Sequence, residues 1–462
     1  MKNYFFNVDF SKELKKDILS VGVEWDPPMY DMTPDLTDEQ WELLYKRMDF
    51  FQLGLTRVMM YSPLVQETGQ NDYNDRRVKN VLKVLEYCQK RNVNVMLGFW
   101  NKPWWVETYD DPMLIKSIAD FLIWLREEKG ITCVRWFNYV NEPNGSWEIP
   151  ENAWLRWLPG IKALHKEFDA RGVLEHTKIC GPDSAYDDEW VEMCIAAIPD
   201  VIGDYEYHIY LHDKSEIIEN EFEDRLRLKR RNITKNDANG KDKRLWLGEF
   251  GCRDGNWNEA NDTQNDCYNF IYGVWMADAV CQAFRAGLDG MIPWQMDDAG
   301  HPAGDVGGRN GRFKGFGFWN IYGGQTIYGS ESSTAYPIEE RNVRPWFSIM
   351  SLYSRLFKRG GTTIDVGPVQ DYIKICALKY KDRFSIVVVN ASDEPAQVSL
   401  VLDGLKEFKT GDVPVKKYVY FEDDRPVDAD GFPVVKETLM MGDLNNIVKM
   451  PGKGVVFFST LD

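Results

Sequence analysis

Residues 134–144 read Val-Arg-Trp-Phe-Asn-Tyr-Val-Asn-Glu-Pro-Asn, a mainly apolar run that ends in a carboxamide, a carboxylate and a proline. Because proline has no N–H to donate to a neighbouring strand, a strand formed by this run must end at Pro143. A continuous apolar run is typical of a parallel strand that is buried on both faces. The segment therefore predicts a buried parallel strand that carries Asn141 and Glu142 at its carboxyl end.

Similar runs recur along the first two thirds of the chain and alternate with stretches of helical spacing, such as the one that opens with the capping-box residues Thr37 and Gln40. In chain order the eight runs span residues 18–24, 55–60, 93–100, 134–140, 178–181, 201–210, 245–250 and 290–295. Eight strand-then-helix units over about 300 residues predict an α/β fold, the (β/α)8 TIM barrel. An open doubly wound sheet is the alternative, but residues 23–28 lack the glycine-rich turn typical of that fold.

The pattern changes after a helical stretch at about residues 345–358, which ends at Gly360 and Gly361. Alternating strands then follow at residues 372–380, 384–390, 397–402, 417–421 and 454–459. Short, evenly spaced strands without helices predict a C-terminal antiparallel β-sandwich. We therefore divide the chain into a catalytic barrel, residues 1–355, and a β-sandwich domain, residues 356–462. Because no Pro/Ser-rich linker joins them, a packed appendage is favoured over an independent sugar-binding module.

Composition excludes several classes of partner. The 462 residues include 55 Lys+Arg and 72 Asp+Glu, a formal charge of −17, which argues against nucleic acid and anionic membranes. No apolar run reaches the roughly 18 residues of a membrane span, and no leader is evident, so we expect a cytoplasmic protein, or a secreted one if a leader was removed. Aromatic residues make up 14% of the chain, with 17 Trp, which favours a concave site for flat amphipathic ligands such as sugars.

A second carboxylate, Glu249, follows the apolar residues 245–248, Leu-Trp-Leu-Gly, and is itself followed by Phe-Gly. A charge in so apolar a segment is costly unless it has a partner or a function. In a barrel, the reactive groups stand at the carboxyl ends of the strands, so Glu142 and Glu249 should face each other across the mouth. Two such carboxyls, one protonated and one ionised, are what cleavage of a glycosidic bond requires.

Other strand ends carry groups that suit this chemistry. Arg57 and Tyr210 should lie beside Glu249 and keep it ionised. His208 is expected near the other glutamate, where it helps to hold or pass a proton, and Trp294 offers a flat surface to a sugar ring. Each of these residues could instead be a packed structural side chain. Their occurrence together on the predicted strands favours the functional interpretation.

Further candidates are weaker because core packing explains any single tryptophan equally well. Trp25 and Trp100 follow strand ends and are predicted to line sugar subsites, with Glu24 binding hydroxyl groups. Trp104, Trp105 and Trp147 are further candidates to line sugar subsites, and Asp26 is a further candidate to bind hydroxyl groups.

No metal or other cofactor is predicted. Asp254, Asn256 and Asn258 resemble the start of a calcium loop, but its sixth position is Glu259 and its twelfth is Asn265, where glycine and glutamate are required.

The ordered set of strand-end residues resembles clan A glycoside hydrolases, and within them families 5 and 39. In those families Asn-Glu-Pro marks the acid/base, so the resemblance assigns this role to Glu142 and implies that Asn141 binds the sugar 2-hydroxyl. The similarity to family 5 also covers Arg57, His208, Tyr210, Glu249 and Trp294, in this order along the chain. Family 5 usually has a histidine after strand 3, where this chain has Leu-Gly-Phe-Trp-Asn at residues 97–101. Family 39 is similar in Asn-Glu-Pro-Asn and in its β-sandwich after the barrel.

The resemblance implies a retaining β-glycoside hydrolase that works by double displacement, with Glu249 as the nucleophile. Long aromatic loops favour exo action on β-linked gluco- or manno-configured oligosaccharides. An endo-β-glucanase or mannanase is the enzymatic alternative, and a carbohydrate-binding protein on an inactive barrel is the non-enzymatic one. The sequence leaves the sugar, the linkage and the oligomeric state open.

Overall fold

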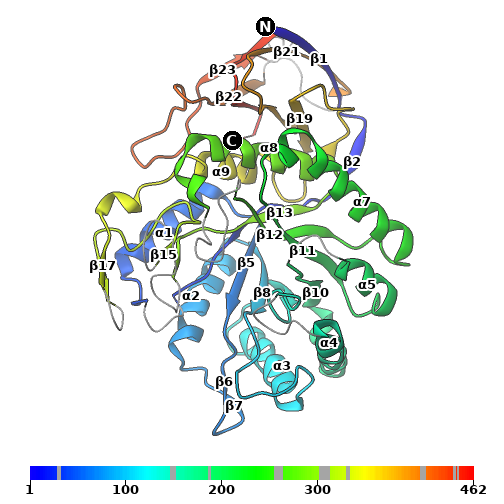
Figure 1. Ribbon diagram of the computed structural model, residues 1–462, viewed down its shortest axis with the longest axis vertical. Coiled ribbons are helices and arrows are strands. Elements are labelled where there is room, and N and C mark those ends of the chain that lie inside the picture. The colour runs from blue at the N-terminus through cyan, green and yellow to red at the C-terminus, as the bar shows by residue number, and fades with distance from the viewer. Residues whose placement is uncertain are drawn as a thin grey trace.

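A barrel of parallel strands surrounded by helices forms the larger part of the protein (Figure 1). The computed structural model describes residues 1–28, 33–145, 152–185, 189–253, 264–300, 313–328, 333–405, 413–440, 444 and 447–461. In sheet order the barrel strands are β3 (Ser20–Val21), β13 (Gly290–Pro293), β12 (Leu245–Cys252), β11 (Asp204–Leu211), β10 (Lys178–Pro182), β9 (Val134–Asn138), β8 (Asn94–Phe99), β5 (Leu55–Met60) and β4 (Val23–Glu24). The predicted TIM barrel is confirmed.

Among the described residues, seven helices follow the first seven barrel strands in chain order, and α9 (Phe347–Leu356) follows the eighth, β13. The seven are α1 (Asp38–Phe51), α2 (Arg76–Lys90), α3 (Pro112–Glu127), α4 (Ala153–Ala170), α5 (Trp190–Ala197), α7 (Glu221–Asn236) and α8 (Phe270–Arg285), with the short α6 (Ser215–Ile218) before α7. The predicted capping box opens α1, since Thr37 Oγ1 accepts from the backbone N–H of Gln40 at 3.2 Å. In the described ranges no helix combines the length and the apolar character needed to cross a membrane.

The first barrel strand is interrupted at Gly22, and this interruption closes the barrel. The half before the glycine, β3, pairs with β13, and the half after it, β4, pairs with β5. A Cβ at Gly22 would lie 2.6 Å from the backbone oxygen of Leu55, so only glycine allows the neighbouring strand to come this close. The single run expected at residues 18–24 is therefore two short strands, each bonded to a different neighbour.

The lower part of the barrel interior is filled with apolar side chains. They are Leu19, Leu55, Met96, Trp136, Cys180, Trp246 and Ile292. Because this layer fills the interior, polar side chains can gather only above it, at the carboxyl ends of the strands. All eight cysteines, Cys180 included, are buried free thiols.

The second domain is a β-sandwich that also includes the start of the chain. Helix α9 (Phe347–Leu356) leads into it. One sheet has the order β2 (Glu13–Lys15), β18 (Thr362–Ile364), β19 (Ile373–Tyr380), β20 (Arg383–Asn390), β25 (Gly454–Ser459), β22 (Pro414–Tyr420) and β23 (Glu437–Met440). The other has the order β1 (Lys2–Asp9), β21 (Ala396–Asp403) and β24 (Ile447–Met450).

The division of the chain at residue 355 remains a prediction. At the amino terminus the strand pairing differs from the predicted domains, because β1 and β2 belong to the sheets of the sandwich. Strand β1 lies parallel to β21 over its whole length, from Lys2 opposite Ala396 to Asp9 opposite Asp403 (Figure 1). Local sequence pattern says which residues form a strand but not which distant strand it joins.

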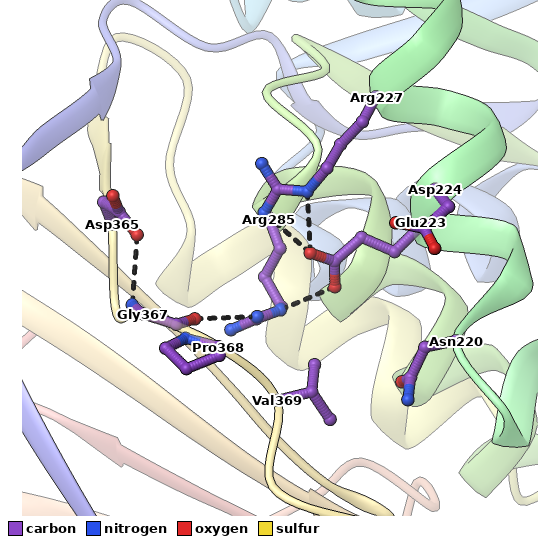
Figure 2. A pocket seen from close by; sticks show the side chains of 9 residues that line it. All are labelled: Asn220, Glu223, Asp224, Arg227, Arg285, Asp365, Gly367, Pro368 and Val369. Carbon is purple, nitrogen blue, oxygen red and sulfur yellow. Dashed lines mark hydrogen bonds and ion pairs between the residues drawn. The ribbon is translucent and has the colours of Figure 1, made fainter.

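Buried ion pairs join the sandwich to the barrel. Lys374 of β19 lies 2.7 Å from Asp278 of α8, and both side chains are fully buried. Arg285 of α8 bonds Glu223 of α7 at 2.7 Å and donates to the backbone oxygen of Gly367 at 2.9 Å (Figure 2). These contacts border a pocket of about 450 Å³ in which the Arg285 and Glu223 charges are already paired. The sandwich is thus packed against the barrel.

Candidate active site

The structure brings seven of the predicted site residues together at the mouth of the barrel. They are Glu24, Arg57, Asn141, Glu142, His208, Tyr210 and Glu249. Glu24 and Tyr210 lie at or next to the carboxyl end of a barrel strand, and Asn141 and Glu142 lie just beyond one. Arg57, His208 and Glu249 lie within their strands and point into the same site, which is where the fold gathers reactive groups.

Arg57 is the centre of the hydrogen-bond network. Its Nη1 donates to Glu24 at 2.9 Å and to Glu249 at 2.6 Å. Its Nη2 donates to Asn141 Oδ1 at 2.6 Å and to Asp183 Oδ2 at 3.0 Å. Burial disfavours the Arg57 charge, but the carboxylates of Asp183, Glu24 and Glu249 outweigh it and raise the pKa of the guanidinium well above its usual value. The guanidinium therefore acts as a permanent cation that orients four side chains.

Both oxygens of Glu249 accept hydrogen bonds. Oε1 accepts from Arg57, and Oε2 accepts from the hydroxyl of Tyr210 at 2.5 Å. Burial and the neighbouring Glu249 carboxylate raise the pKa of Tyr210 well above its usual value, so the phenol remains a donor. Two donors aimed at one carboxylate fix its orientation and suit its ionised form.

A β-bulge turns Glu249 into the barrel. On β12, Leu247 pairs with Tyr207 but Glu249 pairs with His208, so Gly248 is an extra residue in the ladder. In a regular strand Glu249 would share the outward face of Leu247. The bulge reverses this, and it is a feature that the apolar run alone does not reveal.

Glu142 lies on the opposite side of the mouth. Its Oε1 is 2.9 Å from His208 Nδ1, and its backbone N–H donates to the oxygen of Asp183 at 3.0 Å. Its φ is +42°, which is rare for a residue with a side chain and is held here by this bond and by one from the N–H of Gly145. Burial raises the pKa of the Glu142 carboxyl, and the charge of Glu249 adds to the effect, while His208 opposes it.

The two glutamates are close enough to act on one atom. One carboxylate oxygen of Glu142, one of Glu249 and a ring nitrogen of His208 all lie within 4.8 Å of one another. Side-chain exposure is only 9% at Glu142 and 5% at Glu249, so little water reaches either group. Their environments differ. Glu249 accepts from Arg57 and Tyr210, whereas the hydrogen-bond partner of Glu142 among the described side chains is His208, which lies 2.9 Å from Glu142 and 3.6 Å from Glu249.

Two buried acids in this network were not predicted. Asp183, just after β10, accepts from Arg57 and lies 3.0 Å from His208 Nε2. Despite burial, these two partners hold the pKa of Asp183 well below its usual range. Asp183 follows an apolar run, the same signal that identified Glu142, so the sequence could have revealed it. Glu206 is hidden within β11, two residues before His208.

The predicted tryptophans divide into two groups. Trp100 and Trp294 are partly exposed, and their rings meet edge to face with centroids 5.7 Å apart. Trp25 instead is fully buried and packs against Tyr45 and Tyr87 in the core, so it does not line the site as expected.

The remaining weaker candidates lie at the rim or outside the described residues. Asp26 accepts from the N–H of Met59 at 3.0 Å, and burial raises its pKa to about 7. Trp104 is 87% exposed. Trp147 and the acidic loop at residues 254–258 lie outside the described part of the chain.

Among the described residues, two groups could offer three ligand atoms to a metal: Glu142, His208 and Glu249, and Asp183, Glu206 and His208. In each group one acid already binds the Arg57 guanidinium, which would repel a divalent cation. The groups are better explained as one hydrogen-bonded network around Arg57.

Removal of the central cation should destabilise the fold strongly. We expect Arg57→Met to lower the free energy of unfolding by about 3–5 kcal/mol, because it leaves buried carboxylates without a counter-charge. The Asp183 carboxyl has a lowered pKa in the folded state, so this stabilisation is present at neutral pH and should fade as pH falls below about 4, its unfolded value. Urea unfolding at several pH values measures it. The control Arg91→Met breaks an exposed pair with Asp49 and should cost less than about 1 kcal/mol, and an equal loss in both variants would contradict the prediction.

Comparison with known proteins supports the fold. No family model and no curated protein matches the sequence. Solved structures match over nearly the whole chain. A glycoside hydrolase family 30 subfamily 8 xylanase from Clostridium acetobutylicum has 14% identity and a TM-score of 0.64, with 98% of both chains covered. A family 39 β-xylosidase from Caulobacter crescentus has 14% identity and a TM-score of 0.63, with 99% of both covered. A glucosidase from Croceicoccus marinus has 11% identity and a TM-score of 0.65, with 99% of this chain and 98% of that one covered.

The chain therefore has the barrel-plus-sandwich fold of clan A glycoside hydrolases, and the predicted resemblance to that clan is confirmed at the level of the fold. Within the clan, its structural neighbours include members of families 30 and 39.

Proposed function

We propose that this protein is a retaining β-glycoside hydrolase. The observation that carries the proposal is the close approach of Glu142 and Glu249, whose oxygens lie within 4.8 Å of each other. Burial raises the pKa of Glu142, and Glu249 accepts hydrogen bonds from Arg57 and Tyr210. Retaining enzymes hold their two carboxyls about 5–5.5 Å apart, whereas inverting enzymes need roughly 6.5–9.5 Å to admit a water molecule. The short separation favours retention.

In the first step Glu249 attacks the anomeric carbon and forms a glycosyl-enzyme ester. Glu142 gives its proton to the leaving oxygen, so the bond to the aglycone breaks as the ester forms. In the second step the ionised Glu142 takes a proton from water, which attacks the same carbon and releases Glu249. Arg57 and Tyr210 donate to Glu249 and hold it in line for attack.

The surrounding groups suit a single sugar ring at this point. Arg57 holds the carbonyl oxygen of Asn141, which leaves the amide NH2 as the group free to bind the sugar 2-hydroxyl. Trp294, with Trp100 standing edge-on to it, offers an aromatic surface to the apolar face of the ring. Glu24 is fully buried and bonds Arg57, so its role is to orient the guanidinium rather than to reach the substrate.

For the substrate we propose β-linked gluco- or manno-configured oligosaccharides, cleaved from a chain end. The named neighbours are xylanases, a β-xylosidase and a glucosidase, so xylo-configured sugars belong in the same screen. An endo-β-glucanase or mannanase and a sugar-binding protein without turnover are the alternatives.

A panel of nitrophenyl β-glycosides with gluco, manno, xylo and galacto configuration tests the proposal. We expect turnover of at least one, with the β-anomer as the first product seen by proton NMR before mutarotation. An α-anomer formed first would exclude double displacement, and binding without turnover across the panel would favour the non-enzymatic alternative. The sizes of products released from polymers separate exo from endo action.

A further inference from the structure

The buried site contains more acids than cations. Five of its carboxyls are almost fully buried, and they are Glu24, Glu142, Asp183, Glu206 and Glu249. Among the residues that the structure describes, Arg57 and, when protonated, His208 are the cations that pair with these carboxyls. Ionisation of all five would leave an uncompensated negative charge in a region from which water is excluded, which is far too costly. Several of the five must therefore carry a proton.

Hydrogen bonding indicates which acids are ionised. Asp183 accepts from Arg57 and from His208 Nε2, and Glu249 accepts from Arg57 and Tyr210. Donors of this kind bind the carboxylate form. Glu24 also accepts from Arg57, at 2.9 Å, and Glu142 lies 2.9 Å from His208 Nδ1, so Glu206 is the one acid of the five that has no such donor among the described residues.

Glu206 is the acid with the poorest access to donors. Its side chain is fully buried, and no described residue places a hydrogen-bond donor within reach of either of its oxygens. The nearest ring nitrogen, His208 Nε2, is 3.9 Å away and lies 3.0 Å from Asp183 instead. A carboxylate in this position would be unsatisfied on both oxygens, whereas a protonated carboxyl can itself donate.

The surroundings of Glu206 suit a protonated carboxyl that donates a hydrogen bond. An oxygen of Glu206 lies within 4.8 Å of one of Asp183, and the two side chains can share a hydrogen bond only if one of them carries a proton. Cys180 from β10 and Trp246 from β12 are uncharged buried neighbours of Glu206, while the charges of Arg57 and His208 favour its ionised form and oppose the effect of burial. Gly248 of β12 leaves space for the Glu206 carboxyl, because a Cβ at this position would lie 2.3 Å from Glu206 Oε2.

We propose that Glu206 is a permanently protonated acid that donates a hydrogen bond to Asp183 and thereby positions His208 against Glu142. It does not touch the substrate and is a positioning residue, one layer below the site. Burial raises the pKa of Glu206 well above its usual value, and the Asp183 charge adds to this, which agrees with the geometry. Only the catalytic consequence rests on the proposed function; the protonation state does not.

An ionised Glu206 would compete with Asp183 for the His208 Nε2 proton and would add a second negative charge behind the imidazole. The neutral form leaves Asp183 as the only acceptor for that proton. His208 then keeps its Nδ1 directed at Glu142, the group whose proton the reaction needs.

Infrared difference spectroscopy of the full chain tests the protonation state directly. Subtraction of the Glu206→Gln spectrum from that of the wild type should show the C=O stretch of one protonated carboxylic acid, unchanged between pH 5 and pH 9, roughly the range over which an ordinary glutamate is ionised. The control Glu128→Gln removes an exposed acid and should show only carboxylate bands. If Glu206→Gln does not fold, Glu206→Leu gives the same difference band.

Kinetics test the positioning role. Glutamine replaces a neutral donor with a neutral donor, so Glu206→Gln should keep kcat/KM within about twofold of the wild type and leave the alkaline limb of its pH profile in place. Leucine removes the donor. Asp183 then binds the His208 imidazolium more tightly, this cation favours ionised Glu142, and the alkaline limb should move to lower pH. Carboxylate bands in the Glu206→Gln difference spectrum, or the same pH shift in both variants, would overturn the proposal. A protein inactive on every glycoside would leave the spectroscopic result standing.

Discussion

Replacement of Glu249 by alanine is expected to lower turnover of aryl β-glycosides on the order of 10⁴-fold or more, as in enzymes that lose a covalent nucleophile. Sodium azide should then restore reaction and yield the α-glycosyl azide. The reason is geometric. The lost carboxylate leaves a cavity between the Nη1 of Arg57 and the hydroxyl of Tyr210, and both of these donors can hold a small anion there. Azide in that cavity attacks the face that Glu249 attacked, so the stable product has inverted stereochemistry.

Product NMR identifies the anomer, and two further measurements keep the result interpretable. Thermal unfolding shows whether the variant is folded, since Arg57 loses one of its partners. Glu437→Ala, which removes an exposed acid paired with Lys417 in the sandwich, should retain full activity. Wild-type turnover by Glu249→Ala would remove this residue from the mechanism, and a β-glycosyl azide would mean that the roles of the two glutamates are exchanged.

Much of this site could be predicted because a barrel converts position along a strand into position in space. Glu142 follows an apolar run, and Arg57 and His208 are polar residues within such runs, and the fold gathers the polar groups of its strands at one mouth. What local pattern cannot supply is a change of ladder register. Strict alternation would point Glu249 outward, and only the extra residue Gly248 turns it inward.

The prediction that Trp25 lines the site was wrong, although the sequence contained enough information to assign this residue to the core. Neighbouring residues of a strand point to opposite faces, so Glu24 and Trp25 could not both face the barrel mouth. Glu24 reaches Arg57 inside the barrel, and Trp25 packs outside it against Tyr87. The period-two rule, applied to this pair, would have assigned the tryptophan to the core.

Replacement of Glu142 by alanine should affect the two chemical steps differently. With a dinitrophenyl glycoside, whose leaving group needs no proton, the glycosyl-enzyme should form normally and then accumulate, because no base activates water. A burst of one equivalent of phenol followed by slow release measures this. Substrates with poor leaving groups should react about 10²–10⁴-fold more slowly, the usual contribution of a general acid.

The pH profile of Glu142→Ala supplies a second readout, and its sign follows from burial. The wild type needs the protonated carboxyl, and burial raises the pKa of Glu142, so activity should persist above the ordinary glutamate value and then fall as pH rises through the raised one. The variant should lack this alkaline limb. Azide should now yield the β-glycosyl azide, because it enters where Glu142 stood and attacks the glycosyl-enzyme from the face opposite Glu249. If azide gives opposite anomers in the Glu249→Ala and Glu142→Ala variants, the roles of both carboxyls are assigned. An unchanged alkaline limb, or the α-azide from this variant, would place the acid/base elsewhere in the network around His208.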